Sequence, residues 1–192
     1  EMCGRGLEEV KNPSELFLSS ESATGVATIV ACEGTRSLVV DLQALVSATS
    51  YPSPRRTATG VGTNRLHQIL AVLEKHMRIP LSRYDCYLAV AGGLEVEEPS
   101  SDLGIAIAIV SSYRDITLSK GTVLIGELGL GGQLRSVSLL EQRLQEAIRL
   151  GFCRAVVPKD NGLGVISTSK ELEVFEASNI SEAIVMALGA CS

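Results

Sequence analysis

The first 77 residues combine two runs rich in β-branched residues with one helical pattern. Thr24–Val30 and Ser37–Leu42 are rich in apolar and β-branched residues, and the polar Glu33–Arg36 lies between them with a glycine. Such an arrangement is typical of a β-hairpin. Apolar residues then recur at helical spacing between Asn64 and Met77, which predicts an amphipathic helix.

The remaining chain alternates short apolar runs with helices. Leu103–Val110 is apolar on every face, which predicts a central, buried helix. A hairpin with Gly131 and Gly132 as a two-residue turn is expected over Leu128–Val137. The other expected elements are strands at Cys86–Val90, Val123–Ile125, Ala155–Pro158 and Glu173–Phe175, and helices at Ser138–Leu150 and Ser181–Leu188. This order predicts an α/β fold, an α+β sandwich of mixed sheets packed with helices, over residues 21–192, with residues 1–20 as a lead-in.

Polar residues at the helix starts predict specific caps. Thr63 or Asn64 can cap the first helix. Ser138 and Glu141 have the Ser-x-x-Glu spacing of a capping box, and Gly151 follows that helix as a C-terminal stop.

Charge is distributed unevenly along the chain. The 192 residues carry a net charge of −5, yet the segment 51–83 holds six Lys and Arg residues against Glu74 alone, so it is +5 and the remainder −10. An ordinary solvated surface explains a charge run of this size, and an anion-facing or subunit-facing surface is the sharper hypothesis. The candidate DNA contacts are Arg55, Arg56, Arg65 and Lys75.

Several classes of protein are disfavoured. The five cysteines lack Cys-x-x-Cys spacing and there are only two histidines, so neither a disulfide framework nor a zinc site is expected and a reducing compartment fits. No apolar run reaches the length of a membrane span, and no signal peptide is visible. The sequence contains no Gly-x-x-x-x-Gly-Lys-Ser/Thr loop, so we expect no nucleotide cofactor and no metal in this chain.

Ser100 is the most reactive candidate. It lies just before the predicted buried helix, where exposed helix amides can stabilise an oxyanion. A nucleophilic serine also needs a base. The simpler interpretation is that Ser100 or Ser101 caps the helix.

Several segments of the chain resemble a known family. Gly126–Arg135, the helix ending at Gly151 and Ala155–Lys159 are similar to the proteolytic domain of Lon proteases. The closer resemblance is to the Lon-like C-terminal domain of the RadA (Sms) family of DNA-repair proteins. It is carried by Gly6–Leu18, Pro54–Gly60, Asn64–Leu66 with Leu70–Lys75, and Val90–Gly93.

The resemblance implies a larger parent and several partners. Family members are ATP-driven branch-migration motors with a zinc finger and a RecA-like ATPase, so the parent would use ATP, Mg and Zn. Their Lon-like domain is expected to be a non-catalytic scaffold of a hexameric ring that contacts single-stranded or branched DNA, beside a RecA-type recombinase, and to bind no membrane. A bacterial cytoplasm or an organelle matrix, rather than secretion, would suit it.

The carried-over catalytic positions are incomplete. Ser100 falls on the Lon nucleophile, Asp102 replaces a glycine of the Lon motif, and Glu141 falls on the catalytic lysine. A carboxylate cannot supply the amine base, and the loop residue Lys120 gives no reason to expect it in the site. We therefore expect no enzyme activity in this chain. Two alternatives remain, an active Ser-Lys peptidase and a purely structural ring collar, and the basic residues can also pair with a neighbouring subunit.

Overall fold

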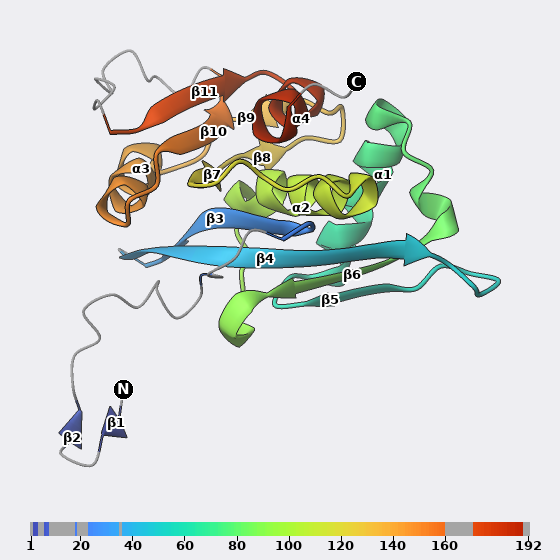
Figure 1. The fold of residues 1–192 in the computed structure, drawn as a ribbon, viewed down its shortest axis with the longest axis horizontal. Helices are drawn as coiled ribbons and strands as arrows, with labels where there is room; N and C mark the ends of the chain where they lie inside the picture. The colour runs from blue at the N-terminus through green and yellow to red at the C-terminus, as the bar shows by residue number, and fades with distance from the viewer. Residues whose placement is uncertain are drawn as a thin grey trace.

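The fold is described by a computed structural model that covers residues 2–3, 6–7, 18, 23–34, 36–159 and 171–189. One mixed sheet dominates it (Figure 1). Its strands are β3 (Val26–Glu33), β4 (Arg36–Ala48), β5 (Arg56–Thr59), β6 (Tyr84–Val90), β7 (Thr122–Leu124), β10 (Arg154–Pro158) and β11 (Glu173–Ala177). Their order is β11-β10-β7-β3-β4-β6-β5, and most neighbouring pairs are parallel. The predicted mixed α/β fold is confirmed.

The β3–β4 hairpin is the centre of the sheet. Its antiparallel register runs from Val26 opposite Gln43 to Glu33 opposite Arg36, as the alternating pattern predicts. However, β4 continues to Ala48, well beyond the predicted end at Leu42, because its second half pairs with β6. In that half Gln43, Leu45 and Ser47 are exposed while Ala44 is buried and Val46 half-buried, so the strand is buried on one face only.

Helices cover one face of the sheet fully and the other face only in part. On the first face lie α1 (Thr63–Met77), α2 (Asp102–Arg114) and α4 (Ile180–Leu188), which share one core with the inward-facing strand residues. On the second face α3 (Leu140–Arg149) packs over β3, β7, β10 and the first half of β4 in a separate core. Figure 1 shows the sheet curving around α2, which lies between β3–β4 and β10–β11.

The central helix α2 is buried on all sides, as predicted. Residues Asp102 to Ser111 are all buried. Gly104 allows the helix to approach β3 closely, since a Cβ at that position would lie only 2.1 Å from Ile29 Cγ2. The absence of a side chain at residue 104 therefore sets the depth at which α2 lies on the sheet.

The glycine-rich segment forms a small hairpin from β8 (Glu127–Leu128) and β9 (Leu134–Arg135). The predicted two-residue turn at Gly131 and Gly132 is wrong. The amide of Gly132 donates to the carbonyl of Gly129 at 2.9 Å, so the turn centres on Leu130 and Gly131, and Gly132 follows with φ of 80°. The positive φ at Gly132 explains the need for glycine there.

The predicted side-chain caps are mostly wrong. The N-cap of α1 is Gly62, with no side-chain hydrogen bond, so neither Thr63 nor Asn64 caps this helix. The N-cap of α3 is Leu139 with φ of 57°, and no side chain caps it, so Ser138 and Glu141 form no capping box. By contrast, Gly151 has the positive φ expected of a C-terminal stop.

The short strands β1 (Met2–Cys3) and β2 (Gly6–Leu7) pair with each other, and most of the Gly6–Leu18 segment and of the predicted lead-in lies outside the described residues. Over the described ranges, no helix has the length and apolar character needed to cross a membrane.

Candidate functional site

The segment before α2 carries a buried polar cluster. Pro99 starts the 3-10 helix η4 (Pro99–Ser101), which continues directly into α2. Ser100, Ser101 and Asp102 are exposed by only 4%, 2% and 1%. Buried polar groups need partners, so the contacts of these side chains decide what the cluster can do.

Asp102 links three elements. Its carboxylate accepts two hydrogen bonds from Arg65 of α1, at 2.5 Å from Nε and 2.8 Å from Nη2, and one from the Leu128 amide of β8 at 3.0 Å. Burial raises the pKa of Asp102 to about 6, and the hydrogen bonds from Leu128 and Arg65 oppose that shift only in part. Arg65 therefore holds α1 against the start of α2 instead of projecting freely into solvent.

Glu98 and Arg143 form a second ion pair beside the first. Arg143 donates to Glu98 through Nη1 at 2.8 Å and Nη2 at 2.7 Å, in the bidentate geometry that guanidinium and carboxylate favour. The Arg143 side chain is only 1% exposed, while that of Glu98 is 24% exposed. Arg143 also donates to the carbonyls of Val30 and Ser138, which ties α3 to β3 and to its own preceding loop.

The Glu98 carboxylate is held in its charged form. Burial alone would raise its pKa, but the hydrogen bond and charge of Arg143, with the Cys32 amide at 2.8 Å, lower it below the ordinary value of 4.5. The same pairing raises the pKa of Arg143 against the opposing effect of burial. Both members of the pair are therefore ionised at neutral pH, and both carboxylate oxygens of Glu98 accept from Arg143.

Ser100 is the unpaired member of the cluster. Its hydroxyl makes no hydrogen bond of ordinary geometry, although it lies near enough to Glu98 to contribute to lowering the pKa of that carboxylate. It does not cap α2, and Ser101 donates its hydroxyl proton to the Glu98 carbonyl instead of accepting a helix amide. The predicted cap role of these serines is therefore wrong.

Glu141, which the resemblance places at the catalytic lysine, is not among the contacts of the buried cluster. Glu141 is exposed in the first turn of α3, and its carboxylate is 3.5 Å from Gln145 Nε2. Lys120 is exposed in the loop before β7. Two arginines flank the serine segment, Arg143 through Glu98 and Arg65 through Asp102. A guanidinium of raised pKa cannot act as a general base.

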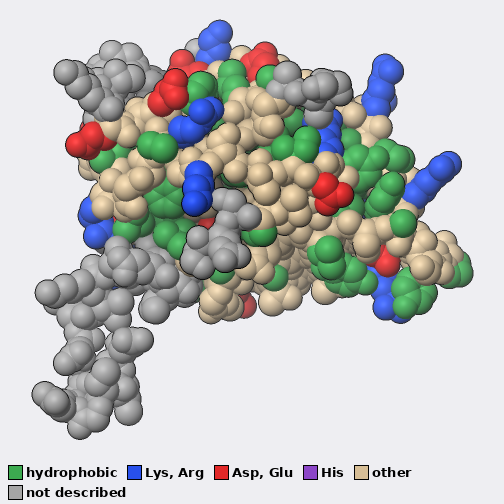
Figure 2. Space-filling view, viewed as in Figure 1, with side chains coloured by type: hydrophobic (Ala, Val, Ile, Leu, Met, Phe, Trp, Pro, Cys, Tyr) green, Lys and Arg blue, Asp and Glu red, His purple; other side chains and the backbone are tan. Residues whose placement is uncertain are grey.

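Of the four candidate DNA contacts, two are bonded to groups within the domain and two are exposed. Arg65 is bound to Asp102, and Arg56 lies on the helix-covered face of the sheet, where Nη2 donates to the Leu81 carbonyl at 3.4 Å. The side chains of Arg55 and Lys75 are exposed. Several Lys and Arg side chains project from the side of the molecule where α1 and the β4–β5 loop lie (Figure 2).

Sequence reasoning missed Arg143, although a signal was present. Arg143 follows Leu140 by three residues and precedes Leu144 and Ala147, so it lies on the apolar stripe of an amphipathic helix. A charged residue on a buried stripe requires a partner, and Glu98 is that partner. No group of three or more His, Cys, Asp or Glu side chains in the described part of the chain is placed to hold a metal ion.

Comparison with known proteins defines the family. The family model described as subunit ChlI of Mg-chelatase matches residues 57–161, more than half of the chain. The chain therefore belongs to this family. The matched region contains all of β5 except Arg56, together with α1, the buried cluster, α3 and β10.

Individual relatives are DNA-repair proteins. DNA repair protein RadA of Synechocystis sp. is 56% identical over 192 residues, which cover 99% of this chain and 37% of that protein. RadA of Halalkalibacterium halodurans and RadA of Bacillus subtilis are each 46% identical over 191 residues, covering 98% of this chain and 42% of each relative. The homology to RadA expected from the sequence is confirmed. The chain spans well under half the length of these relatives.

Proposed function

We propose that this chain is a non-catalytic, Lon-protease-like domain of a RadA-type protein in DNA repair. The observation that carries this proposal is the state of the buried cluster: Ser100 has no base, and the charges around it are paired with each other. A serine nucleophile requires a neighbouring amine or imidazole to accept its proton. The cluster instead joins α1, α2, α3 and the β8–β9 hairpin, which is an architectural task.

The domain serves as an oligomerisation scaffold and as a DNA-contacting surface. Residues 21–192 form the Lon-like unit, with residues 1–20 leading into it, and the assembled form is a hexameric ring. DNA contact is supported by the exposed cations Arg55 and Lys75 and by the homology to DNA-repair proteins. Arg56 and Arg65 have partners within the domain, so they contribute less to phosphate binding.

We propose that ATP hydrolysis and branch migration belong to parts of the intact protein that this chain does not span. The sequence contains no phosphate-binding Gly-x-x-x-x-Gly-Lys-Ser/Thr loop. We therefore assign ATP, Mg and Zn to the rest of the intact protein, and we propose single-stranded or branched DNA and a RecA-type recombinase as its partners. A bacterial cytoplasm and an organelle matrix are both consistent with this role.

DNA contact is tested by the salt dependence of binding. Each Lys or Arg that neutralises a phosphate contributes a slope of roughly −0.7 to −0.9 in log K against log salt. Replacing both Arg55 and Lys75 by Ala in the intact protein should weaken DNA binding and reduce the slope by roughly one to two. Lys120→Ala removes an exposed cation outside the basic segment and is the matched control. An unchanged affinity and slope in the double variant would exclude these two residues as the contact.

A further inference from the structure

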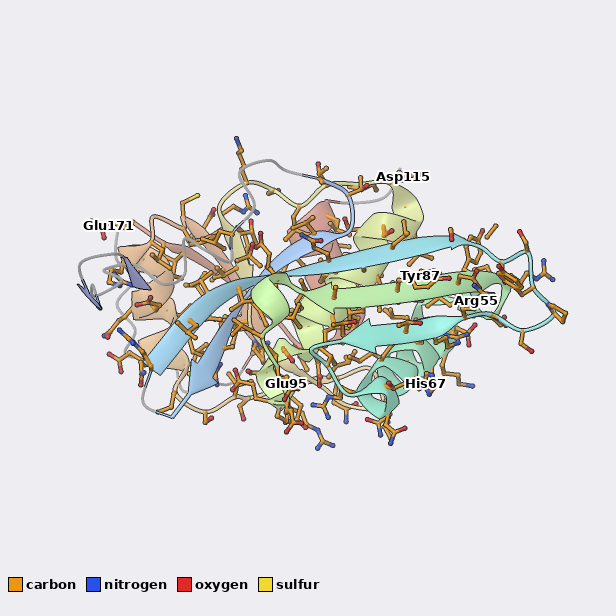
Figure 3. The ribbon with its side chains drawn as sticks, turned by 90° about the horizontal axis from the view of Figure 1, so that it is seen from below. Arg55, His67, Tyr87, Glu95, Asp115 and Glu171 are labelled. Carbon is orange, nitrogen blue, oxygen red and sulfur yellow. The ribbon has the colours of Figure 1, made fainter. Side chains whose placement is uncertain are left out.

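The second face of the sheet is bare over β5, β6 and the second half of β4. Helix α3 covers this face over β3, β7, β10 and the first half of β4, and no described helix lies over the remaining part. Figure 3 views the bare face directly, with Tyr87 on β6 and Arg55 at the start of β5. Leu45 of β4 is 59% exposed there, although its neighbours Ala44 and Val46 point into the core or its margin.

Two rows of side chains cross this face in register. In the first row Leu45 of β4, Tyr87 of β6 and Thr57 of β5 lie side by side. In the second row Gln43, Ala89 and Thr59 occupy the same strands in the same order. Strand alternation puts the intervening residues on the helix-covered face. The rows therefore place the half-buried Tyr87 ring between Leu45 and Thr57, beside a second row of uncharged side chains.

A groove lies along these rows. Its volume is about 880 Å³, and its lining includes Gln43, Leu45, Thr57, Thr59 and Tyr87, with the Ala23–Val26 segment along one side. None of the lining residues is charged. The acidic residues of β4 and β6 on this side of the sheet are buried: Asp41 is 3% exposed and accepts from Thr28, and Asp85 is 6% exposed and accepts from the Arg55 amide. A polyanion on this face therefore meets no exposed carboxylate within the groove.

Cations and a second aromatic ring lie at one end of the face. The Arg55 guanidinium lies 3.6 Å from the centre of the Tyr51 ring, and both side chains are exposed. The exposed Arg83 is at the same end, because its carbonyl accepts from the Thr49 amide just beyond β4. The face thus combines a neutral platform with a basic rim.

We propose that this sheet face binds single-stranded nucleic acid, with an unpaired base stacked on Tyr87 and the adjoining phosphates on Arg55 and Arg83. The inference rests on the proposed function and specifies the form of nucleic acid that the domain takes. Sheet surfaces with an exposed aromatic ring and a basic border bind unpaired bases by stacking, which tolerates any sequence. A duplex keeps its bases inside and gains nothing from Tyr87, so the platform discriminates between the two forms.

The test compares single-stranded and duplex DNA of equal length, by fluorescence anisotropy on the intact protein at fixed salt. Stacking contributes roughly 1–3 kcal/mol per base, so Tyr87→Ala should weaken single-strand binding by roughly 5- to 150-fold. Duplex binding should change less than twofold, and Tyr87→Phe, which keeps the ring, should retain single-strand affinity.

The remaining outcomes separate this inference from the proposed function. If Tyr87→Ala leaves single-strand affinity unchanged while Arg55→Ala weakens binding of both single-stranded and duplex DNA, base stacking on Tyr87 is wrong and the proposed DNA contact stands. If neither variant changes either affinity, both proposals fall. If Tyr87→Ala instead lowers the oligomeric mass in solution and weakens both forms of DNA equally, the face is an interface between copies of the chain and the inference is overturned.

Discussion

Removal of the Arg143 guanidinium should be among the most damaging single changes to the fold. Arg143→Met keeps an unbranched, apolar side chain of similar length but leaves Glu98 without its bidentate partner and the Val30 and Ser138 carbonyls without their donor. Breaking a buried ion pair by removing one partner costs about 3–5 kcal/mol, because a desolvated charge remains. Since the Glu98 side chain keeps 24% exposure, we expect the lower end of this range.

The assay is equilibrium unfolding in urea at pH 7, supported by thermal unfolding. For a chain of this length a loss of about 3 kcal/mol corresponds to a fall in Tm of roughly 6–12 °C. Arg149→Met is the matched control on the same helix, because Arg149 is 50% exposed and its pair with Glu146 spans only three residues. Such surface pairs contribute about 0–1 kcal/mol.

A double-mutant cycle isolates the pair. Glu98→Gln combined with Arg143→Met removes both charges, so the double variant should be more stable than the sum of the two single losses predicts, by about 0.5–3 kcal/mol. The reasoning is refuted if Arg143→Met costs no more than Arg149→Met, or if the two single effects simply add.

Three further predictions concern pH and packing. The pKa of Glu98 is lowered in the fold, so the stability that its ionised form provides is present above the ordinary value of 4.5. This stability is lost as the pH falls through the folded pKa. Glu98→Gln should therefore make the free energy of unfolding less dependent on pH in the acid range. The pKa of Asp102 is raised from 3.8 to about 6, so the stability that its protonated form provides is present below pH 3.8 and is lost as the pH rises through about 6. In Asp102→Asn the free energy of unfolding, measured over the same pH range, should no longer show this loss. Gly104→Ala should lower the free energy of unfolding in urea by about 1–3 kcal/mol, because the added Cβ collides with Ile29. Gly62→Ser is the control: residue 62 faces open space at the N-cap of α1, so this change should be neutral or stabilise by about a few tenths of a kcal/mol.

Local patterns predicted the elements well where burial was uniform. The β3–β4 hairpin and the buried helix α2 follow from runs of apolar residues and one glycine-containing turn, and the structure has both. The second half of β4 was missed because its outer face is polar or exposed, so the apolar run ends at Leu42 while the strand continues. Pairing with β6, a contact distant in sequence, decides where β4 ends.

Capping motifs failed for a related reason. Ser138 and Glu141 have the correct spacing for a capping box, but Leu139 between them adopts a left-handed conformation and the Ser138 carbonyl accepts from Arg143. The long-range pair of Arg143 with Glu98 accompanies this geometry, and no local spacing rule contains it. Tertiary contacts therefore overrode local propensity at this helix start.

The candidate site was only partly readable from the sequence. The pattern singled out Ser100, and the structure does bury it beside charged groups, but it could not show that those charges are paired with each other. Likewise, the basic run drew attention to Arg56 and Arg65 as surface cations, although both have partners within the domain. One-dimensional charge counts cannot separate a cation that faces solvent from one that holds two elements together.

Turnover of an unfolded protein substrate tests the central claim most directly. Wild-type protein, Ser100→Ala and Glu141→Lys should all show no hydrolysis above the buffer rate, because Ser100 is buried without a base and residue 141 is exposed on α3. The Glu141→Lys result is the sharper one, since this change restores the residue type of a Ser-Lys peptidase. Hydrolysis by the wild-type protein that Ser100→Ala abolishes would contradict the account.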